Sequence, residues 1–220
     1  MGATVAKVNL ITLTEPRSAT AEAYRTLRTN LMFANVERPV STLLVTTPTD
    51  ITDKSLTLAN LAITFAQAGN NTILVDSNLR QPVQHELWGL PNDRGLTTMM
   101  SEDAALASPP LQTTDIPHLS ILTSGPSPDI PADVLSSQRI NEVIGLLKAR
   151  ANFVLFDSPP VLTYTDASLL GIKLDGVLMV ARAGNTRRDH IQRAQQALER
   201  VHARLLGVVL TNAPRSSIGT

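Results

Sequence analysis

Three short polar clusters contain the side chains that are best suited to bind a charged ligand. The first is Lys54-Ser55, the second runs from Asp76 to Arg80, and the third begins at Asp157. A lysine can neutralise phosphate, a serine hydroxyl beside it can bind Mg²⁺, and carboxylates can hold that ion and its water molecules. Each cluster alone is ambiguous, because such residues also begin ordinary helices and cap loops. Together, in this order, they predict a nucleotide-type site.

Each of these clusters follows or ends a short apolar segment that is typical of a buried strand. Strands are predicted at residues 41–47, 72–76, 119–125, 153–157, 176–182 and 205–211. Helices are predicted at residues 20–34, 54–68, 131–149 and 186–203, with shorter ones near 94–101 and 165–173. Continuous apolar strands that alternate with amphipathic helices are typical of a parallel sheet covered on both faces. We therefore predict an α/β fold with a doubly wound, mostly parallel sheet, whose strand ends bring the clusters to one edge.

The length favours one large domain over two small ones. Residues 1–19 show no sustained period and are predicted to form an N-terminal arm. Residues 20–213 are predicted to form the domain, and residues 214–220 a C-terminal tail. Within the domain, residues 81–130 are irregular and rich in proline.

The composition excludes several other kinds of site. The 220 residues contain no cysteine, which excludes disulfides, thiolate metal sites and cysteine nucleophiles. The four histidines lack an i,i+4 pair, which disfavours a histidine metal site. Lys+Arg and Asp+Glu both number 19, so the net charge gives no general attraction to nucleic acid or acidic membranes. The sequence also lacks a membrane-spanning apolar run and a secretory signal, so a cytoplasmic location is expected.

The motifs resemble those of the bacterial tyrosine autokinases, or BY-kinases, of capsule and exopolysaccharide synthesis, which are related to the MinD/ParA P-loop ATPases. The resembling segments are EAYRTLRTNL at 22–31, ILVDSNLRQP at 73–82, GLPNDRGLT at 89–97, FVLFDSPPVLTYTDA at 153–167, DGVLMVARAGNTRRD at 175–189 and LLGVVLTNA at 205–213. The Arg-Gln-Pro and Asp-Ser-Pro-Pro details favour this family over MinD or ParA themselves.

The resemblance implies ATP and Mg²⁺ as cofactors and assigns roles to the polar clusters. Lys54 would steady the phosphates, and Asp76 would be the candidate base or metal partner, so these two are the implied catalytic residues. Ser55, Asp76 and Asp157 would hold Mg²⁺. The implied nucleotide-binding residues are Asp53, Lys54, Ser55, Arg80 and Asp157.

The resemblance also implies partners. Glu22, Arg25 and Arg28 fit the E-x-x-R-x-x-R pattern that the family uses for contacts between subunits of a ring. The alternative is a solvated helix face, which is the usual role of such charges. A membrane-spanning polysaccharide co-polymerase or activator protein is the second implied partner, and it would bring the chain to the inner face of the membrane.

The sequence departs from the family pattern at the phosphate loop. Ile51 and Asp53 stand where the family has glycines, and Asn78 stands where it has a second aspartate. At ~4–5 Å and an effective dielectric near 20, a carboxylate beside the phosphate would cost about 3–4 kcal/mol. The two tyrosines, Tyr24 and Tyr164, lie inside predicted elements, so no tyrosine cluster is present to accept phosphate.

Two hypotheses follow from these departures. The chain is either a tyrosine kinase with a degenerate phosphate loop, or a non-catalytic scaffold or regulatory subunit of the polysaccharide export machinery. In the second case Lys54 and Ser55 would only begin a helix, with Asp53 as its cap. A MinD/ParA-like ATPase is a weaker third alternative.

Overall fold

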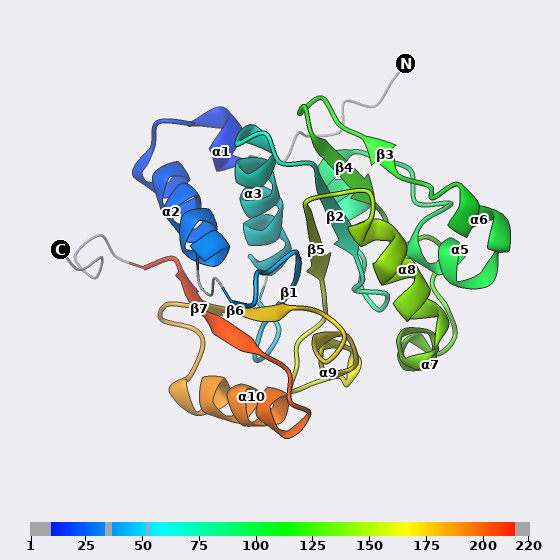
Figure 1. Ribbon diagram of the computed structural model, residues 1–220. Helices are drawn as coiled ribbons and strands as arrows, with labels where there is room; N and C mark the ends of the chain where they lie inside the picture. Colours follow the sequence, from blue (N-terminus) through cyan, green and yellow to red (C-terminus); the bar gives the residue numbers. More distant parts are fainter. Residues whose placement is uncertain (1–9, 34–36, 52, 214–220) are drawn as a thin grey trace, which may run out of the picture.

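The structure is a computed structural model that describes residues 10–33, 37–51 and 53–213 (Figure 1). The predicted tail at 214–220 and the first nine residues of the predicted arm lie outside these ranges. The strands are β1 Thr42–Thr46, β2 Thr72–Asp76, β3 Gln112–Thr113, β4 Leu119–Leu122, β5 Phe153–Asp157, β6 Gly176–Arg182 and β7 Leu205–Thr211. They form one sheet in the order β3-β4-β2-β5-β1-β6-β7. Every pairing is parallel except that of β3 with β4, so the predicted fold class is confirmed.

Helices cover both faces of this sheet (Figure 1). They are α1 Ile11–Thr14, α2 Ala19–Phe33, α3 Lys54–Gln67, α4 Gln84–Trp88, α5 Leu96–Ser101, α6 Asp103–Ala107, α7 Pro131–Ser136, α8 Arg139–Lys148, α9 Asp166–Gly171 and α10 Arg188–Arg200. Helices α1, α2 and α3 lie on one face, and α8, α9 and α10 lie on the other.

The apolar strands supply side chains to two cores, one on each face. Leu43 and Val45 of β1 pack in the core that contains Phe65 of α3. Leu44, between them, points the opposite way and packs in the core that contains Leu198 of α10. Because successive side chains of a strand alternate between faces, a strand buried on both faces must be apolar throughout. Burial of one such leucine or valine stabilises the fold by about 1.5–3 kcal/mol.

The predicted helix at 131–149 is in fact two helices, α7 and α8. Ser137 follows α7 in an extended conformation, with φ −62° and ψ 159°. Serine side chains hydrogen-bond nearby main-chain groups in non-helical conformations, so the Ser136-Ser137 pair favours an end to α7 at this point. In the irregular segment, α4, α6 and β3 were not predicted, because elements of two to five residues leave no measurable period.

The segment predicted as an arm contains α1, which packs on α3. The main-chain N–H and the hydroxyl of Thr12 donate to Asn60 Oδ1, at 3.0 and 2.9 Å, and Thr12 is buried. Part of this segment is therefore fixed on the domain. The limits of the domain at 20–213 stay a prediction.

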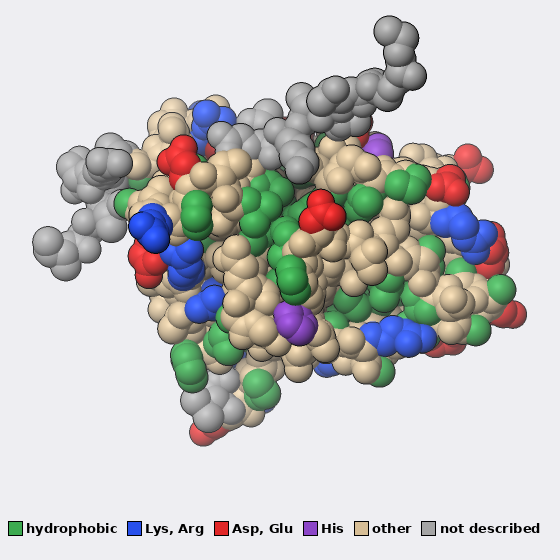
Figure 2. All heavy atoms as spheres, turned by 90° about the horizontal axis from the view of Figure 1, so that it is seen from above, with side chains coloured by type: hydrophobic (Ala, Val, Ile, Leu, Met, Phe, Trp, Pro, Cys, Tyr) green, Lys and Arg blue, Asp and Glu red, His purple; other side chains and the backbone are tan. Residues whose placement is uncertain are grey.

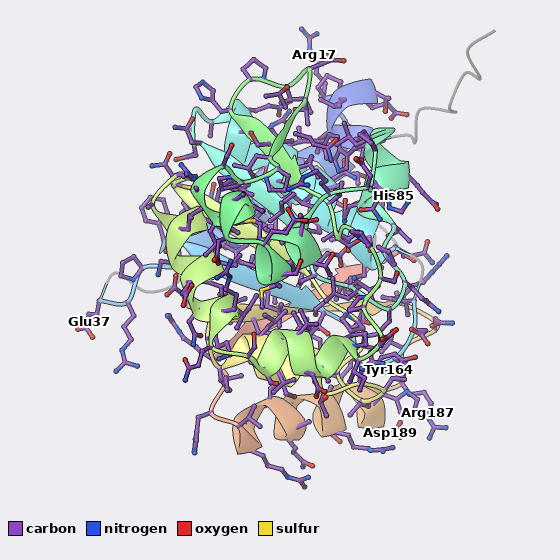
Figure 3. All side chains as sticks on the ribbon, turned by 90° about the vertical axis from the view of Figure 1, so that its right-hand side faces the viewer. Arg17, Glu37, His85, Tyr164, Arg187 and Asp189 are labelled. Atoms are coloured by element: carbon purple, nitrogen blue, oxygen red, sulfur yellow. The ribbon has the colours of Figure 1, made fainter. Side chains whose placement is uncertain are left out.

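The sheet order brings the ends of β1, β2 and β5 together. Strand β5 lies between β1 and β2, and the register sets Asp76 beside Asp157. Helix α3 begins at Lys54, in the connection that leaves β1. In Figure 3, His85, Tyr164 and Arg187 all lie along one side of the molecule, and they belong to segments that follow β2, β5 and β6.

Candidate functional site

A cavity of about 340 Å³ opens at this edge of the sheet. Three segments supply its walls, one after each of β1, β2 and β5. The lining residues are Thr47, Asp50, Ile51, Lys54, Ser55, Asn78, Arg80, Gln81, Val83, Pro159, Pro160 and Tyr164. Among the predicted site residues, Lys54, Ser55 and Arg80 line the cavity. Asp76 and Asp157 are fully buried and are not part of its wall.

Lys54 is directed at the end of β5. Its ammonium group forms an ion pair with Asp157 Oδ1 and lies 3.3 Å from Ser55 Oγ. The side chains of Lys54 and Asp157 are 6% and 0% exposed. Burial lowers the pKa of Lys54 to about 7, although the nearby carboxylates of Asp76 and Asp50 oppose this shift. An incoming phosphate would therefore compete with Asp157 for the lysine.

Asp76 shapes the loop that covers the cavity. Its Oδ2 accepts hydrogen bonds from the main-chain N–H groups of Val83 and Gln84, at 3.0 and 2.9 Å. Its Oδ1 accepts one from the N–H of Asn78 at 3.2 Å. Burial raises the pKa of Asp76 to about 6, against the opposing effects of these bonds and of Lys54. In this arrangement both carboxylate oxygens already have partners.

Arg80 presents its charge to the cavity from a fixed position. Its Nε and Nη2 donate to the two carboxylate oxygens of Asp166, both at 2.9 Å. The guanidinium carbon lies 4.2 Å from the centre of the Tyr164 ring, which also lines the cavity. The sequence analysis did not single out Asp166, although it lies in the segment that follows the third cluster. A bidentate pair with a buried carboxylate restricts the arginine side chain.

Asp53 does not face the cavity, and the predicted repulsion of phosphate is corrected accordingly. Its Oδ1 accepts a hydrogen bond from Arg182 Nη1 at 3.0 Å, and its Oδ2 accepts one from Thr211 Oγ1 at 3.0 Å. Its carboxylate is thus turned toward β6 and β7, beside a positive charge. The side chain makes no capping bond to α3 either, because its φ of −93° and ψ of −6° are helical, whereas a capping residue is normally extended. The other replacements, Ile51 and Asn78, do line the cavity.

Two polar residues that the sequence analysis missed complete the site. Gln84 is fully buried and donates to Asp157 Oδ2 at 2.7 Å. Thr47 is also fully buried and lines the cavity, and within the described ranges its hydroxyl has no hydrogen-bond partner. A buried hydroxyl at a cavity wall is available to form a hydrogen bond with a polar ligand. No sequence motif marks either residue, because their roles depend on contacts distant in the chain.

These residues fit a magnesium-bound nucleotide. Lys54, Ser55 and the Thr47 hydroxyl surround the start of the 14-residue helix α3, where main-chain N–H groups favour an anion. No group of three or more His, Asp or Glu side chains among the described residues could hold a metal ion by itself. Mg²⁺ commonly takes only one or two protein ligands and completes its shell with phosphate oxygens and water. Ser55 and Asp157 could supply those ligands.

The predicted contact residues of α2 lie away from this cavity. Arg25 pairs with Glu22 at 2.8 Å and donates to the carbonyl of Pro16 at 2.6 Å. Arg28 Nη1 donates to the carbonyl of Thr64 on α3 at 2.8 Å. All three charged residues thus make contacts inside the chain, and their role between subunits stays a prediction. In the part of the chain that the structure describes, no helix has the length and apolar character needed to cross a bilayer.

The sheet order and the helices on both of its faces define the class of fold, the α/β fold of the MinD/ParA P-loop proteins. The septum site-determining protein MinD of Pyrococcus horikoshii, solved with Mg-ADP, shares the fold with a TM-score of 0.65 at 20% identity, over 77% of this chain and 69% of that one. No family model matches the sequence.

Sequence relatives then give the family. Tyrosine-protein kinase YwqD of Bacillus subtilis is 38% identical over 202 residues, which are 92% of this chain and 85% of that protein. The chimerical protein CapA2B2 has a TM-score of 0.87 at 35% identity, over 94% of this chain and 91% of that one. The kinase domain of Escherichia coli tyrosine kinase ETK has a TM-score of 0.89 at 26% identity, over 97% of this chain and 84% of that one. The chain belongs to the bacterial tyrosine-protein kinase family, which confirms the predicted resemblance.

Proposed function

We propose that this chain binds Mg-ATP and transfers the γ-phosphoryl group to tyrosine, in the control of capsular or exopolysaccharide synthesis and export. The observation that carries the proposal is the cavity at the start of α3, where Lys54, Ser55 and the unpartnered hydroxyl of Thr47 share one wall. Membership of the family supports tyrosine as the acceptor.

The residues of the cavity have separable roles in this proposal. Bound Mg-ATP would supply the phosphoryl group. Lys54 would exchange its partner Asp157 for phosphate oxygens, and Arg80, held by Asp166, would add a second positive charge. Ser55 and Asp157 would hold Mg²⁺. Such catalysis consists mainly of positioning and of electrostatic stabilisation of the transferred group.

Asp76 is the candidate base or additional metal partner. Its pKa of about 6 is closer to neutral pH than that of an ordinary aspartate, which suits proton transfer. To act directly it would have to release some of its hydrogen bonds from Val83, Gln84 and Asn78. Movement of the loop at residues 78–83 would therefore accompany its action.

A non-catalytic scaffold or regulatory subunit is the second candidate function. Two departures from the family pattern favour this function, because both residues line the cavity where nucleotide would bind. Ile51 brings an apolar side chain to a wall where phosphate would approach the main chain. Asn78 keeps an acceptor oxygen but lacks the charge of a second carboxylate.

Assembly and location are part of the same proposal. A ring of identical subunits would form through Glu22, Arg25 and Arg28 of α2, and a membrane-spanning co-polymerase or activator would hold the ring at the inner face of the membrane. On the face shown in Figure 2, acidic and basic side chains are interspersed and form no large basic patch of the kind that attracts nucleic acid. The net charge of zero agrees with this.

The decisive experiment measures binding and transfer together. Mg-ATP is titrated calorimetrically into the parent chain, Ile51→Gly and Asp53→Gly, and phosphotyrosine is then measured by mass spectrometry after incubation with Mg-ATP and a tyrosine-containing peptide. We expect binding by the parent, about tenfold tighter binding by Ile51→Gly because main-chain N–H groups become accessible, and no gain from Asp53→Gly because Asp53 faces Arg182.

The possible outcomes separate the two functions. Binding together with phosphotyrosine supports the kinase. Binding without any phosphotyrosine, in the chain or in the peptide, supports the scaffold. No binding by the parent contradicts the proposal that the cavity is a nucleotide site.

A further inference from the structure

Gln84 contacts both of the buried carboxylates that end β2 and β5. Its main-chain N–H donates to Asp76 Oδ2 at 2.9 Å, and its side-chain Nε2 donates to Asp157 Oδ2 at 2.7 Å. Asp76 and Asp157 are neighbours in the register of the sheet, so Gln84 spans the two at the first position of α4. All three residues are fully buried.

The chemistry of its neighbours fixes the orientation of the Gln84 amide. Trp88 Nε1 donates to Gln84 Oε1 at 3.1 Å, and an indole N–H can only donate. An ionised carboxylate such as Asp157 can only accept, and so can the main-chain carbonyl of Ser55, which lies 3.2 Å from Gln84 Nε2. One orientation of the amide therefore satisfies all three neighbours, and the reversed orientation would satisfy none.

The two oxygens of Asp157 have different partners, which matters when a ligand arrives. Lys54 binds Oδ1 and Gln84 binds Oδ2. If Lys54 turns to phosphate, Gln84 still binds the Asp157 carboxylate. Among the side chains of the described residues, it is then the remaining partner of that carboxylate. A buried carboxylate without a partner is costly and free to reorient.

We propose that Gln84 is a positioning residue that holds the Asp157 carboxylate in place for Mg²⁺ once Lys54 has moved to the nucleotide, with Trp88 fixing the Gln84 amide. The metal-binding half of this inference rests on the function proposed above. The linkage from Asp157 through Gln84 to Trp88 belongs to the ligand-free chain and is testable without nucleotide.

The first measurement uses Trp88, which is the single tryptophan of the chain. Emission spectra are recorded for the ligand-free parent, Asp157→Asn, Gln84→Leu and the double variant, after circular dichroism confirms that each is folded. We expect Asp157→Asn to shift the emission maximum when Gln84 is present and to leave it unchanged when Gln84 has been replaced. A side chain that only fills space would not transmit the change. An equal shift in both backgrounds, or no shift in either, overturns the linkage.

The second measurement compares ATP affinity with and without Mg²⁺. We expect Gln84→Leu to reduce the gain in affinity that Mg²⁺ provides by about tenfold or more, as partners of metal ligands commonly do, while affinity without Mg²⁺ stays nearly the same. Gln84→Glu keeps an acceptor for Trp88 but opposes Asp157, so it should lose the Mg²⁺ gain as well. Gln195→Leu, at an exposed position of α10, is the control and should match the parent.

The results that would contradict the role of Gln84 differ from the result that would contradict the proposed function. A parent chain without affinity for ATP would contradict nucleotide binding, and the emission spectra would still decide whether Gln84 links Asp157 to Trp88. Equal loss of affinity with and without Mg²⁺ in Gln84→Leu would show a general structural role and overturn the positioning role. An unchanged Mg²⁺ gain would overturn it too.

Discussion

Lys54 and Asp157 form a buried ion pair at the centre of the site. Both groups are buried, and a buried pair offsets its desolvation only while both partners are present. Gln84 and Ser55 add hydrogen bonds around it. In the ligand-free site Asp157 is therefore neutralised by the same lysine that would bind phosphate, so phosphate binding would have to replace this ion pair.

Replacement of Lys54 tests the energy of this pair. We expect Lys54→Met to lower the free energy of unfolding by about 3 kcal/mol or more, because Asp157 is left buried without its cation. Urea denaturation at neutral pH provides the measurement. The matched control is Lys173→Met, whose ammonium bonds Asn141 at an exposed position and whose loss should change stability by less than about 0.5 kcal/mol. Equal effects of the two substitutions would contradict the assigned energy.

At the residue scale, the sequence identified the site residues that belong to a motif. It missed Thr47 and Gln84, whose place in the site depends on contacts with residues distant in the chain. Lys54, Ser55 and Arg80, which were chosen from motifs, line the cavity, and their binding of nucleotide stays a prediction. The repulsion expected from Asp53 did not take account of Arg182 and Thr211, which bind its carboxylate and lie 129 and 158 positions further along the chain. Local sequence gives the type of a side chain, but its partner decides whether a charge repels a ligand.

At the scale of elements, Asp175 fastens the start of β6 to the start of β1. Its Oδ2 accepts hydrogen bonds from the main-chain N–H and the hydroxyl of both Ser41 and Thr42, at 2.8 to 3.0 Å. Lys148 lies 3.5 Å from its other oxygen. Burial acts against the charged form, but the bonds from Ser41 and Thr42 outweigh it and lower the pKa of Asp175 to about 2.

This lowered pKa gives a prediction for acid. Because the unfolded chain binds the proton more readily, the stabilisation is complete above about pH 4 and is lost as the pH falls toward about 2. We expect Asp175→Asn to cost about 1–2 kcal/mol at pH 7, with the gap from the parent narrowing below pH 4 in thermal unfolding followed by circular dichroism. Asp103→Asn removes an exposed ion pair and should change little at any pH. A gap that stays constant with pH would refute this assignment.

The first and last residues of a strand could be predicted from the sequence where burial on both faces of the sheet requires a continuous apolar run. The strands β2 and β5 have the predicted bounds, since apolar runs between turns mark buried strands well. The break between α7 and α8 was missed because the four residues between Leu135 and Ile140 include no proline or glycine to mark it. The short β3 has no pattern of its own, and its pairing with β4 alone defines it.

At the scale of the whole molecule, α2 offers the surface through which copies of the chain would assemble. Phe33, at its last position, is 70% exposed, and Met32 beside it is 37% exposed. The contacts of Arg25 with Glu22 and the carbonyl of Pro16 are exposed, whereas the bond of Arg28 to the carbonyl of Thr64 on α3 is partly buried. Arg25 is therefore the better placed of the two arginines to reach another subunit.

Light scattering tests this assembly. We expect Arg25→Ala together with Arg28→Ala to lower the assembly mass at a fixed protein concentration, because two cationic groups leave the contact surface. Arg28→Ala alone serves to measure how far loosening of α2 from α3 contributes, since it removes the bond to Thr64. Thermal unfolding of each variant separates loss of assembly from loss of fold. An unchanged mass in the double variant would remove α2 from the interface.

The position of β1 also has a consequence for synthesis on the ribosome. Strand β1 is made early but pairs only with β5 and β6, which follow more than 100 residues later. The phosphate loop is anchored even later, when Thr211 of β7 reaches Asp53. A nascent chain thus exposes an apolar central strand until its last third has been translated, which makes folding slow and vulnerable to aggregation. Truncation after β2 would leave this strand without either neighbour.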